Sequence, residues 1–548
     1  MSGARPAAVY ISPCLGPWLG AFPFDTTVLT PGPGIFDLPA ELASRGLTPD
    51  LIIQDEVLAP RVLLKGLEEF PCPKLFWSQD PHLNLYWQTP YAGLFDAVAS
   101  TQKAQAQSLG QACGGTSAWI TWSEPQGPWT PHADRTHAMA FVGRLTQYRP
   151  LRQMFVECVR SRFPIRIETD LPHPDVPGVY AKARLAPNES ILGETTHRLF
   201  LASAQGCLVV EPQRANGLEE LYEPGLEVVT YQDGLELLDV LAFYSRHADL
   251  AAKMGRAAWE RSGRDHRPEN RIASLAELAL RVVPLPRTGG EGRRLFALAC
   301  ARALESALLP ASFDEVAGQL AQFPDDPDCF TARLRLLACA GQSVQALSEA
   351  LARASAGFAP DDMAFRSSLC ALALRQGQFE LARAAFGAYA AASGVAGTQA
   401  ATPAALYAAL GDALARQGKR WRPGFPFEPE RHLPATASEC SLMSLMLEPG
   451  NKGVLRKAES LLRDLPGSEL TRMAYLSEMS LRNREDFRLG LSLGLADLRA
   501  YRVDEGLDEI RLAREQAQAH GKAGAFQAAL AARDPSGRIR AALEKAKA

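Results

Sequence analysis

The sequence lacks several features that would have assigned it to a class of protein directly. Among its 548 residues no apolar run reaches the roughly 18 residues that a membrane span needs. The ten cysteines include no C-x-x-C pair, so neither a disulfide framework nor a zinc site is expected. A net charge of −3 and a pI near 6.4 argue against a partner such as nucleic acid or an anionic membrane.

Signature motifs of several enzyme classes are missing as well. The chain has no G-x-G-x-x-G, no Walker loop, no H-E-x-x-H and no serine nucleophile elbow. The letters Asp-Pro-Asp at 326–328 resemble a metal-binding D-x-D, but they lie where a turn or a helix start is expected. Most cysteines lie in apolar segments, which indicates buried free thiols and a reducing, cytoplasmic location.

What the chain does contain is the composition of an ordinary folded protein, with 47% hydrophobic and 22% charged residues. It is too long for one hydrophobic core, so about two to four domains are expected. The N-terminal segment is a poor signal peptide, because its apolar stretch is very short and Ser-Pro follows. It fits a first β-strand over 7–11 better.

The first part of the chain, up to about residue 135, alternates short apolar segments with helical ones. Nearly continuous apolar strands between helices are typical of a parallel sheet that is covered on both faces. The pattern predicts strands at 7–11, 49–54, 73–79 and 94–101, and helices at 36–46, 61–70 and 102–111.

A segment rich in proline and polar residues, 122–137, has the composition of a linker, and the alternation restarts after it. Strands are predicted at 138–145, 164–169, 180–188, 207–212 and 227–231, and helices at 151–163, 196–206, 218–225 and 234–247. The fold class is therefore α/β, with two tandem Rossmann-like domains, 1–135 and 136–285. Two such sheets leave a cleft at their strand C-termini, where ligands bind.

After a Pro/Gly linker at 282–294, alanine and leucine become more frequent and helical patterns continue to the end of the chain. A third, all-helical domain is expected over 290–548. Two of its segments superpose with a period of 36 residues, which pairs Gly341 with Gly377, Ala346 with Ala382, and Ala350 with Phe386. That period is close to the tetratricopeptide (TPR) unit, in which stacked helix pairs bury a common core. An irregular helical bundle is the alternative.

The segments "AFVGRLTQYRPLRQMF", "YAKARLAPNES", "HRLFLASAQGCLVV" and "GLEELYEPGLEVVTYQDGLELLDVLAFYSRH" follow one another in an order that resembles a known family. This order is similar to the nucleotide-binding half of the GT-B glycosyltransferases, of the CgeB-like, spore-maturation type. "CPKLFWSQDPH" and "YAGLFDAVASTQKAQ" resemble the N-terminal half of that family. The resemblance covers residues 50 to 280 approximately and leaves the helical region outside.

The resemblance implies a hexosyltransferase-like enzyme whose nucleotide-diphosphate sugar binds mainly to the second domain, without a cofactor or a bound metal. The diphosphate must then be met by basic side chains, backbone N–H groups and helix N-termini. Gly143 and Arg144 follow the first strand of that domain, and His197 and Arg198 begin a later helix. For Gly143 and Arg144 the structural alternative is a tight strand-exit turn with a surface arginine, and for His197 and Arg198 it is a helix cap and a surface salt bridge.

Gly217, Leu218, Glu219 and Glu220 match the loop that lies against the donor sugar and ribose in GT-B enzymes. A carboxylate there accepts hydrogen bonds from hydroxyl groups. The competing explanation is that the two glutamates stabilise the dipole of the helix that they begin.

One position departs from the family pattern. Many retaining GT-B enzymes carry a glutamate where this chain has Leu201, while Glu194 lies close to the earlier glutamate of the pair. The missing carboxylate leaves the retaining mechanism open and also leaves open an inactive, binding-only domain.

In the first domain, Asp80 and His82 follow an apolar strand and are candidates for the general base that takes the acceptor's proton. Turn formation by Asp-Pro is the alternative. Gly16, after the first strand, is a candidate for a glycine loop beside the donor phosphates. The favoured interpretation is a glycosyltransferase whose helical domain recognises a protein or peptide acceptor, and the alternative is a non-catalytic scaffold.

Overall fold

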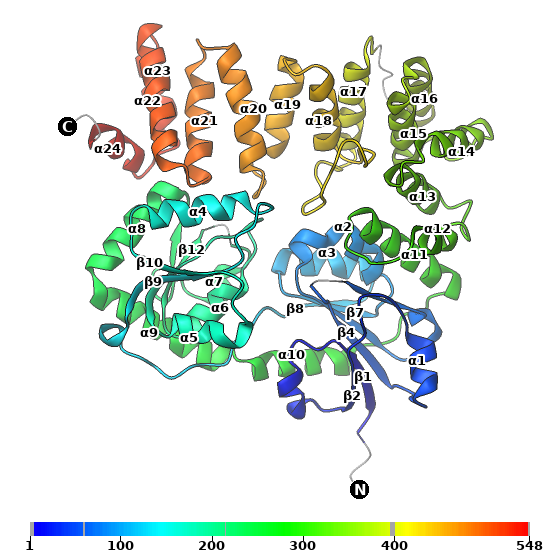
Figure 1. The fold of residues 1–548 in the computed structure, drawn as a ribbon, viewed down its shortest axis with the longest axis horizontal. Helices are drawn as coiled ribbons and strands as arrows, with labels where there is room; N and C mark the ends of the chain where they lie inside the picture. The colour runs from blue at the N-terminus through cyan, green and yellow to red at the C-terminus, as the bar shows by residue number, and fades with distance from the viewer. Residues whose placement is uncertain (1–4, 59–60, 214, 395–399, 546–548) are drawn as a thin grey trace. The chain divides into compact units, whose positions relative to one another are not determined.

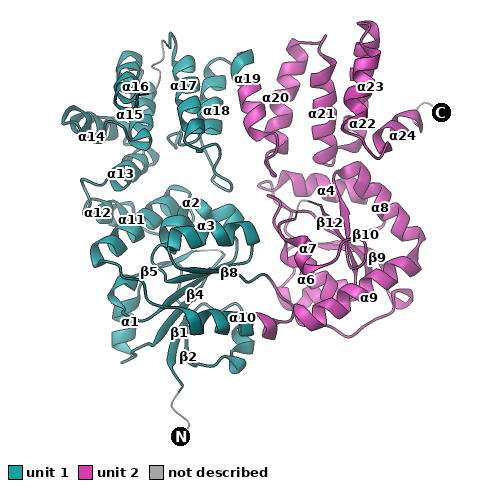
Figure 2. Cartoon of the chain, turned by 180° about the vertical axis from the view of Figure 1, so that it is seen from behind, with its two compact units in different colours: residues 1–121, 272–454 teal, residues 122–271, 455–548 magenta. Residues whose placement is uncertain are grey.

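The structure is a computed structural model that describes residues 5–58, 61–213, 215–394 and 400–545. The chain forms two compact units, which are coloured separately in Figure 2. Unit 1 contains residues 1–121 and 272–454, and unit 2 contains residues 122–271 and 455–548. Each unit combines one α/β domain with one part of the helical region, so the predicted helical domain is divided between them.

The α/β domain of unit 1 is built on a parallel sheet, as predicted. In the described residues its strand order is β2-β1-β4-β6-β7-β8. The strands are β1 (Ala7–Ile11), β2 (Asp25–Leu29), β4 (Leu51–Asp55), β6 (Lys74–Ser78), β7 (Ala97–Ser100) and β8 (Thr116–Trp119). The predicted first strand, 7–11, is confirmed at both ends.

Both faces of this sheet are buried, because successive side chains of each strand point to opposite sides. Ile52 and Phe76 pack on one side, against helices α3 (Lys103–Cys113) and α11 (Gly289–Glu305). Ile53 and Trp77 pack on the other side, against helix α10 (Pro268–Arg281). Helix α10 begins in unit 2, and its residues from Ile272 onward belong to unit 1. This domain also contains η1 (Gly16–Ala21), α1 (Leu38–Ser44) and α2 (Pro81–Ala92).

The helix predicted over 61–70 is wrong. This segment forms strand β5 (Val62–Lys65), which pairs in parallel with β3 (Gly34–Asp37), and then a 3₁₀ turn, η2 (Leu67–Glu69). Gly66 separates the two at a φ of 83°, a left-handed backbone conformation that ends the strand. A short apolar run followed by acidic residues fits a helix or a strand equally well, and pairing with β3 decided between them.

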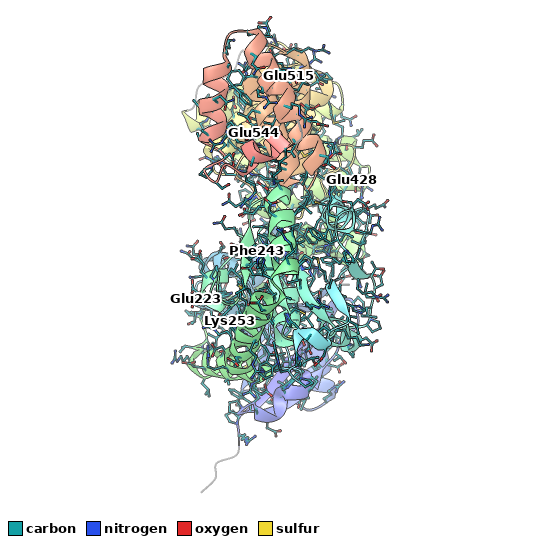
Figure 3. The ribbon with its side chains drawn as sticks, turned by 90° about the vertical axis from the view of Figure 1, so that its left-hand side faces the viewer. Glu223, Phe243, Lys253, Glu428, Glu515 and Glu544 are labelled. Carbon is teal, nitrogen blue, oxygen red and sulfur yellow. The ribbon has the colours of Figure 1, made fainter. Side chains whose placement is uncertain are left out.

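The α/β domain of unit 2 has a second parallel sheet, with strand order β10-β9-β11-β12-β13 in the described residues. Its strands are β9 (His137–Val142), β10 (Ile165–Glu168), β11 (Ala183–Pro187), β12 (Leu208–Pro212) and β13 (Val229–Tyr231). Helices α4 (Pro150–Arg160) and α8 (Gly234–Arg246) cover one face, while α5 (Val176–Tyr180), α6 (His197–Ala204) and α9 (Ala248–Asp265) lie on the other (Figure 1). All of the strands and helices predicted for this domain are present. Exposed side chains such as Phe243 on α8 and Lys253 on α9 cover its outer surface (Figure 3).

The helical part of unit 1 repeats as the sequence predicted. Helices α13 (Pro327–Cys339) and α15 (Met363–Arg375) begin 36 residues apart, and so do α14 (Ser343–Ser355) and α16 (Phe379–Ser393). Gly341 and Gly377 occupy equivalent turns, with φ values of 77° and 70°. The repeat then changes, since α17 (Pro403–Arg416) begins 40 residues after α15. Helices α12 (Phe313–Leu320) and α18 (Ala437–Leu447) complete this part.

The helical part of unit 2 contains α20 (Glu469–Arg482), α21 (Phe487–Arg499), α22 (Val503–Ala519), α23 (Ala523–Ala531) and α24 (Arg538–Lys545). Helix α19 (Lys452–Leu462) connects it to unit 1. This part is fixed to the α/β domain of unit 2 by ion pairs from Arg162 to Asp504 (2.7 Å) and from Arg538 to Glu236 (2.9 Å). No helix among the described residues has both the length and the apolar character to cross a membrane.

Helices α21 and α22 approach each other closely at two glycines, Gly494 and Gly506. A Cβ on Gly494 would stand 2.6 Å from the carbonyl oxygen of Gly506. We therefore expect Gly494→Ala to lower the free energy of unfolding by about 1–3 kcal/mol in a urea titration, because the helices must move apart. Gly524→Ala is the control: it lies in helix α23 with nothing within 4 Å, and it should be neutral or stabilising by up to about 1 kcal/mol. Equal effects of the two substitutions would contradict this explanation.

Candidate functional site

The candidate site lies in unit 2, at the edge of the sheet where its parallel strands end. Strand β9 lies between β10 and β11, so the chain leaves β9 toward one side of the sheet and later returns to the other. In open α/β sheets ligands bind at such a switch point, outside the carboxyl ends of the strands. Gly143 directly follows β9, and Asn188 and Glu189 directly follow β11. These residues are therefore placed where a ligand is expected.

Glu189 is the centre of a buried ion cluster at this edge. Its side chain is 1% exposed and pairs with Arg152 of α4, whose side chain is 4% exposed. Arg198 of α6 donates to Glu189 twice, to the backbone carbonyl (2.8 Å) and to the carboxylate (3.1 Å). Burial and the neighbouring Arg198 lower the pKa of Arg152 to about 10, so it stays charged at neutral pH. One carboxylate thus holds two arginines beside the switch point.

A second carboxylate, that of Glu211 at the end of β12, is also buried and belongs to the same network. The side-chain amide of Asn188 donates to Glu211 Oε2 (2.6 Å) and to the hydroxyl of Thr196 (2.7 Å). Arg198 in turn donates to the side-chain oxygen of Asn188 (2.6 Å). Burial raises the pKa of Glu211 to about 8. Glu211 is therefore largely protonated at neutral pH, and Glu189 supplies the negative charge of the network.

The helical part of unit 2 reaches this network through a pair of tyrosines. The hydroxyl of Tyr501 lies 2.9 Å from that of Tyr231, which donates to the backbone carbonyl of Asn188 (2.7 Å). Tyr501 has a φ of 64°, in the left-handed region that residues other than glycine rarely adopt. Its ring also packs edge-on against Phe155 of α4 (5.2 Å). The hydroxyl of Tyr501 is thus held in a fixed position at the edge of the sheet, although the backbone conformation of this residue is unfavourable.

A cavity of about 650 Å³ opens beside these tyrosines, entirely within unit 2. One side is formed by the loops after β11, β12 and β13, including Gly193, Gln213 and Gln232. The other side comes from the helical part and carries arginines and carboxylates: Arg463, Arg472, Arg488, Arg499, Arg533, Glu459, Asp464 and Glu469. Such a mixture of charged donors and acceptors suits a polar ligand with several hydrogen-bonding groups.

The structure brings two of the predicted donor residues, Gly143 and Arg198, into contact. A Cβ on Gly143 would stand 3.1 Å from Nη1 of Arg198 and 3.2 Å from the ring of Phe141. The absence of a side chain at Gly143 therefore leaves room in front of the guanidinium. The side chain of Arg144 is 73% exposed and, within the part of the chain that the structure describes, forms a long ion pair with Asp170 at 3.6 Å.

The side chain of His197 contacts a different set of residues. Its Nε2 lies 2.9 Å from Glu124, in the segment 122–137 that was predicted as a linker, and its ring stacks on Trp122 (4.9 Å). His173 approaches the same carboxylate oxygen, also at 2.9 Å. Glu124 is held negative, because hydrogen bonds from the two histidines lower its pKa to about 2 against the opposing effect of burial.

The predicted sugar loop begins helix α7 (Leu218–Leu221), with Gly217 at a φ of 78°. Leu218 is buried, whereas Glu219 and Glu220 are exposed. The loop is joined to the segment before α6, because the amide of Asn216 donates to the carbonyl of Gly193 (2.9 Å). The predicted sugar loop therefore lies beside the segment that leads into α6, where His197 and Arg198 are.

The position without the family's glutamate is part of the core. Leu201 is 6% exposed in α6. Glu194 does not replace it, since both of its carboxylate oxygens accept backbone N–H groups of its own loop, from Ile191 (3.0 Å) and Leu192 (2.7 Å).

In unit 1, Asp80 and His82 lie at the start of α2, directly after strand β6. His82 is 7% exposed. The amide of Asp80 donates to the buried carboxylate of Glu56 (3.0 Å), which fixes this turn. Gly16 begins η1, and the nearby amide of Cys14 donates to Asp55 (2.7 Å), whose pKa burial raises to about 7. The two predicted loops of unit 1 are thus each held by a buried acid at the end of β4.

The sequence analysis missed the residues that organise the edge: Glu124, Arg152, His173, Asn188, Glu189, Glu211 and Tyr501. Three of them left a readable signal. Glu211 is a charged residue inside the apolar strand "CLVVEP", and Asn188-Glu189 immediately follows the strand "ARLAP". A charge in or directly after a buried strand requires a partner or a ligand. The partners themselves lie far away in the chain.

A comparison with known protein families matches the part of the chain that contains this site. Residues 135–277 match the family described as "Glycosyl transferase-like", which supports a glycosyltransferase. No curated protein matches the chain. The chain is similar to a sucrose-phosphate synthase from Thermosynechococcus elongatus, with 12% identity, a TM-score of 0.39, and coverage of 50% of this chain and 98% of that one. It is also similar to HepE from Anabaena in complex with UDP, with 12% identity, a TM-score of 0.36, and coverage of 50% and 99%. These similarities are weak, and the family match carries more weight for function.

Proposed function

We propose that the protein is a GT-B glycosyltransferase of the CgeB-like type, which transfers a sugar from a nucleotide-diphosphate donor to an acceptor. The observation that carries the proposal is the family match over 135–277, since this segment contains the switch point and its buried ion cluster. The two Rossmann-like domains, one in each unit, are the pair of domains that a GT-B enzyme requires. The free state of all ten cysteines, which lie in the described residues, suits a cytoplasmic location.

In this proposal the donor diphosphate lies over Gly143, in front of Arg198. Arg198 is fixed by Glu189 and Asn188, so its position needs no rearrangement when the donor binds. Arg144 is exposed and free to move from its long pair with Asp170 to a phosphate oxygen. The N-terminus of α6 adds backbone N–H groups. Transfer itself then requires no metal ion, because arginines and the helix provide the positive charge.

The acceptor is assigned to the cavity beside Tyr501 and to the helical region. The cavity joins donor-domain loops to helical residues within one unit. Stacked helix pairs of the TPR-like kind form extended surfaces that bind peptides, so a protein or peptide acceptor is proposed. Asp80 or His82 is proposed as the general base for the acceptor's hydroxyl group.

The donor assignment predicts the behaviour of Arg144→Ala. Without nucleotide, the variant should unfold at the same temperature as the wild type, because an exposed pair at 3.6 Å contributes little. With UDP or UDP-glucose the stabilisation should be weaker, with a dissociation constant raised about tenfold or more. Arg160→Ala, which breaks an exposed pair on α4, is the matched control. If the two variants respond to nucleotides equally, Arg144 is not part of the site.

A second candidate function is a non-catalytic scaffold, and one observation favours it. Leu201 fills the place of a carboxylate with a buried apolar side chain, and Glu194 is committed to its own loop. Both candidates predict nucleotide binding, so hydrolysis of the donor separates them. Slow release of free sugar from UDP-sugars by the purified chain supports the enzyme. Binding without any release, across a panel of donors, supports the scaffold.

A further inference from the structure

The described part of unit 2 contains a side-chain cluster that is distinct from Gly143, Arg144 and Arg198, to which the donor diphosphate is assigned above. It consists of Glu124, His173 and His197, which belong to three separate segments: the chain before β9, the 3₁₀ helix η4 (His173–Asp175) and the start of α6. The Nε2 atom of each histidine lies 2.9 Å from Oε1 of Glu124. Two ring nitrogens therefore converge on one carboxylate oxygen.

The two spacings between histidine nitrogen and carboxylate oxygen are close to those of neighbouring donors on one metal ion. The ligand atoms all lie within 4.8 Å of one another. Zinc binds imidazole nitrogen and carboxylate oxygen at about 2.0–2.1 Å, which places neighbouring donors of a tetrahedral ion about 3.3 Å apart. A spacing of 2.9 Å needs only a few tenths of an ångström of widening to admit the ion.

The cluster is built into the domain on one side and open on the other. The side chain of Glu124 is 4% exposed, and its amide donates to the carbonyl of His266 (3.1 Å). Trp122 covers one face of the His197 ring, and His173 stacks at 5.4 Å on His197 with the rings inclined by only 13°. His173 itself is 61% exposed. The buried carboxylate and covered ring supply fixed donors, and the exposed ring leaves a coordination position for water.

We propose that Glu124, His173 and His197 bind a divalent transition-metal ion, with zinc as the best fit. Two imidazoles and one carboxylate, with a fourth position for water, form a common zinc ligand set. Magnesium and calcium fit less well, because they prefer oxygen donors. The ion joins the segment before β9 to the first turn of α6 and fixes His197. It is separate from sugar transfer, which we propose to be metal-independent.

The first experiment measures the ion directly, without nucleotide. Purified full-length protein is stripped with a chelator, dialysed against Zn²⁺, and analysed for metal content and by calorimetric titration. We expect one equivalent of zinc that raises the unfolding temperature, and a Co²⁺-loaded form whose visible spectrum shows nitrogen and oxygen ligands. Absence of binding would overturn the proposal. So would a spectrum dominated by sulfur-to-cobalt charge transfer, which would assign the ion to cysteines such as the exposed Cys14.

Two variants test the assignment to these residues. Glu124→Gln keeps the shape and hydrogen-bonding capacity of the side chain, and His173→Ala removes a mostly exposed ring, so both should fold as judged by circular dichroism. Each is expected to weaken zinc binding at least tenfold and to abolish the zinc-dependent rise in unfolding temperature. His520→Ala is the control, since this histidine is exposed and its ring nitrogen contacts the carbonyl of Gln516 in the preceding helix α22. Unchanged zinc affinity in both cluster variants would show that hydrogen bonds alone hold the cluster.

Because zinc is measured without nucleotide, the outcome does not depend on the proposed transferase activity. Nucleotide binding without zinc binding overturns only the metal site. Zinc binding without a response to any nucleotide sugar overturns only the proposed function.

Discussion

Replacement of Glu189 by alanine is expected to lower the free energy of unfolding by about 3–5 kcal/mol at neutral pH. The carboxylate is 1% exposed and is shared by Arg152 and Arg198. Its removal leaves the guanidinium of Arg152, 4% exposed, without its anionic partner in a buried position. Urea denaturation of the full chain, followed by circular dichroism and tryptophan fluorescence, measures the change in the transition to which unit 2 contributes.

The control for this prediction is Glu157→Ala. Glu157 pairs with Arg160 on the surface of α4, with both side chains more than 60% exposed. Its loss should change stability by no more than about 0.5 kcal/mol. A decrease of less than about 1 kcal/mol for Glu189→Ala would show that the two arginines find other partners or water. The network would then not be a fixed support for the donor site.

The second large effect is a loss of stability at alkaline pH through Glu211. Burial raises the pKa of this carboxyl to about 8 from an ordinary value of 4.5. Between these two values the folded protein keeps a proton that the unfolded chain has released. The stabilising contribution is therefore complete below about pH 4.5, declines as the pH rises, and is lost above about pH 8. The shift corresponds to about 4–5 kcal/mol, as an order of magnitude.

Glu211→Gln tests this mechanism, because glutamine has the shape of the protonated acid and cannot ionise. The variant should match the wild type near pH 5 and become more stable than it between pH 8 and 9, as measured by urea denaturation at each pH. The side-chain amide of Asn188 can still donate to the oxygen of the new residue. Glu157→Gln serves as the control for removal of an exposed carboxylate. A constant difference between Glu211→Gln and the wild type across this pH range would contradict the assignment.

Much of the fold could be predicted because its patterns are local. Strand β1 begins and ends where the apolar segment 7–11 does, and helix α1 ends just before Gly46, as expected. The 36-residue repeat aligned Ala346 with Ala382, and both are fully buried on equivalent helices. Prediction failed at 61–70, where the partner strand β3 is the deciding contact and lies about 30 residues away.

The candidate site was predicted less completely. Gly143 and Arg198 were both predicted for the site, and the structure brings them together, but their role toward a donor stays a prediction. The roles of Arg144, His197 and the loop from Gly217 to Glu220 stay predictions. Glu189 and Arg152 were not found, because neither a lone glutamate after a strand nor an arginine on an amphipathic helix indicates that the other is its partner.

The sequence by itself determined the classes of structure: two parallel sheets, a helical region with a partial repeat, and cysteines in apolar surroundings. These follow from periodicity and composition, which are properties of neighbouring residues. Only the tertiary structure decided that helices after residue 454 belong with the second sheet, and that Tyr501 stands at its edge. It also decided that Glu124, His173 and His197 meet. Such contacts join segments that are 24 to several hundred residues apart, and packing of one specific fold is what brings them together.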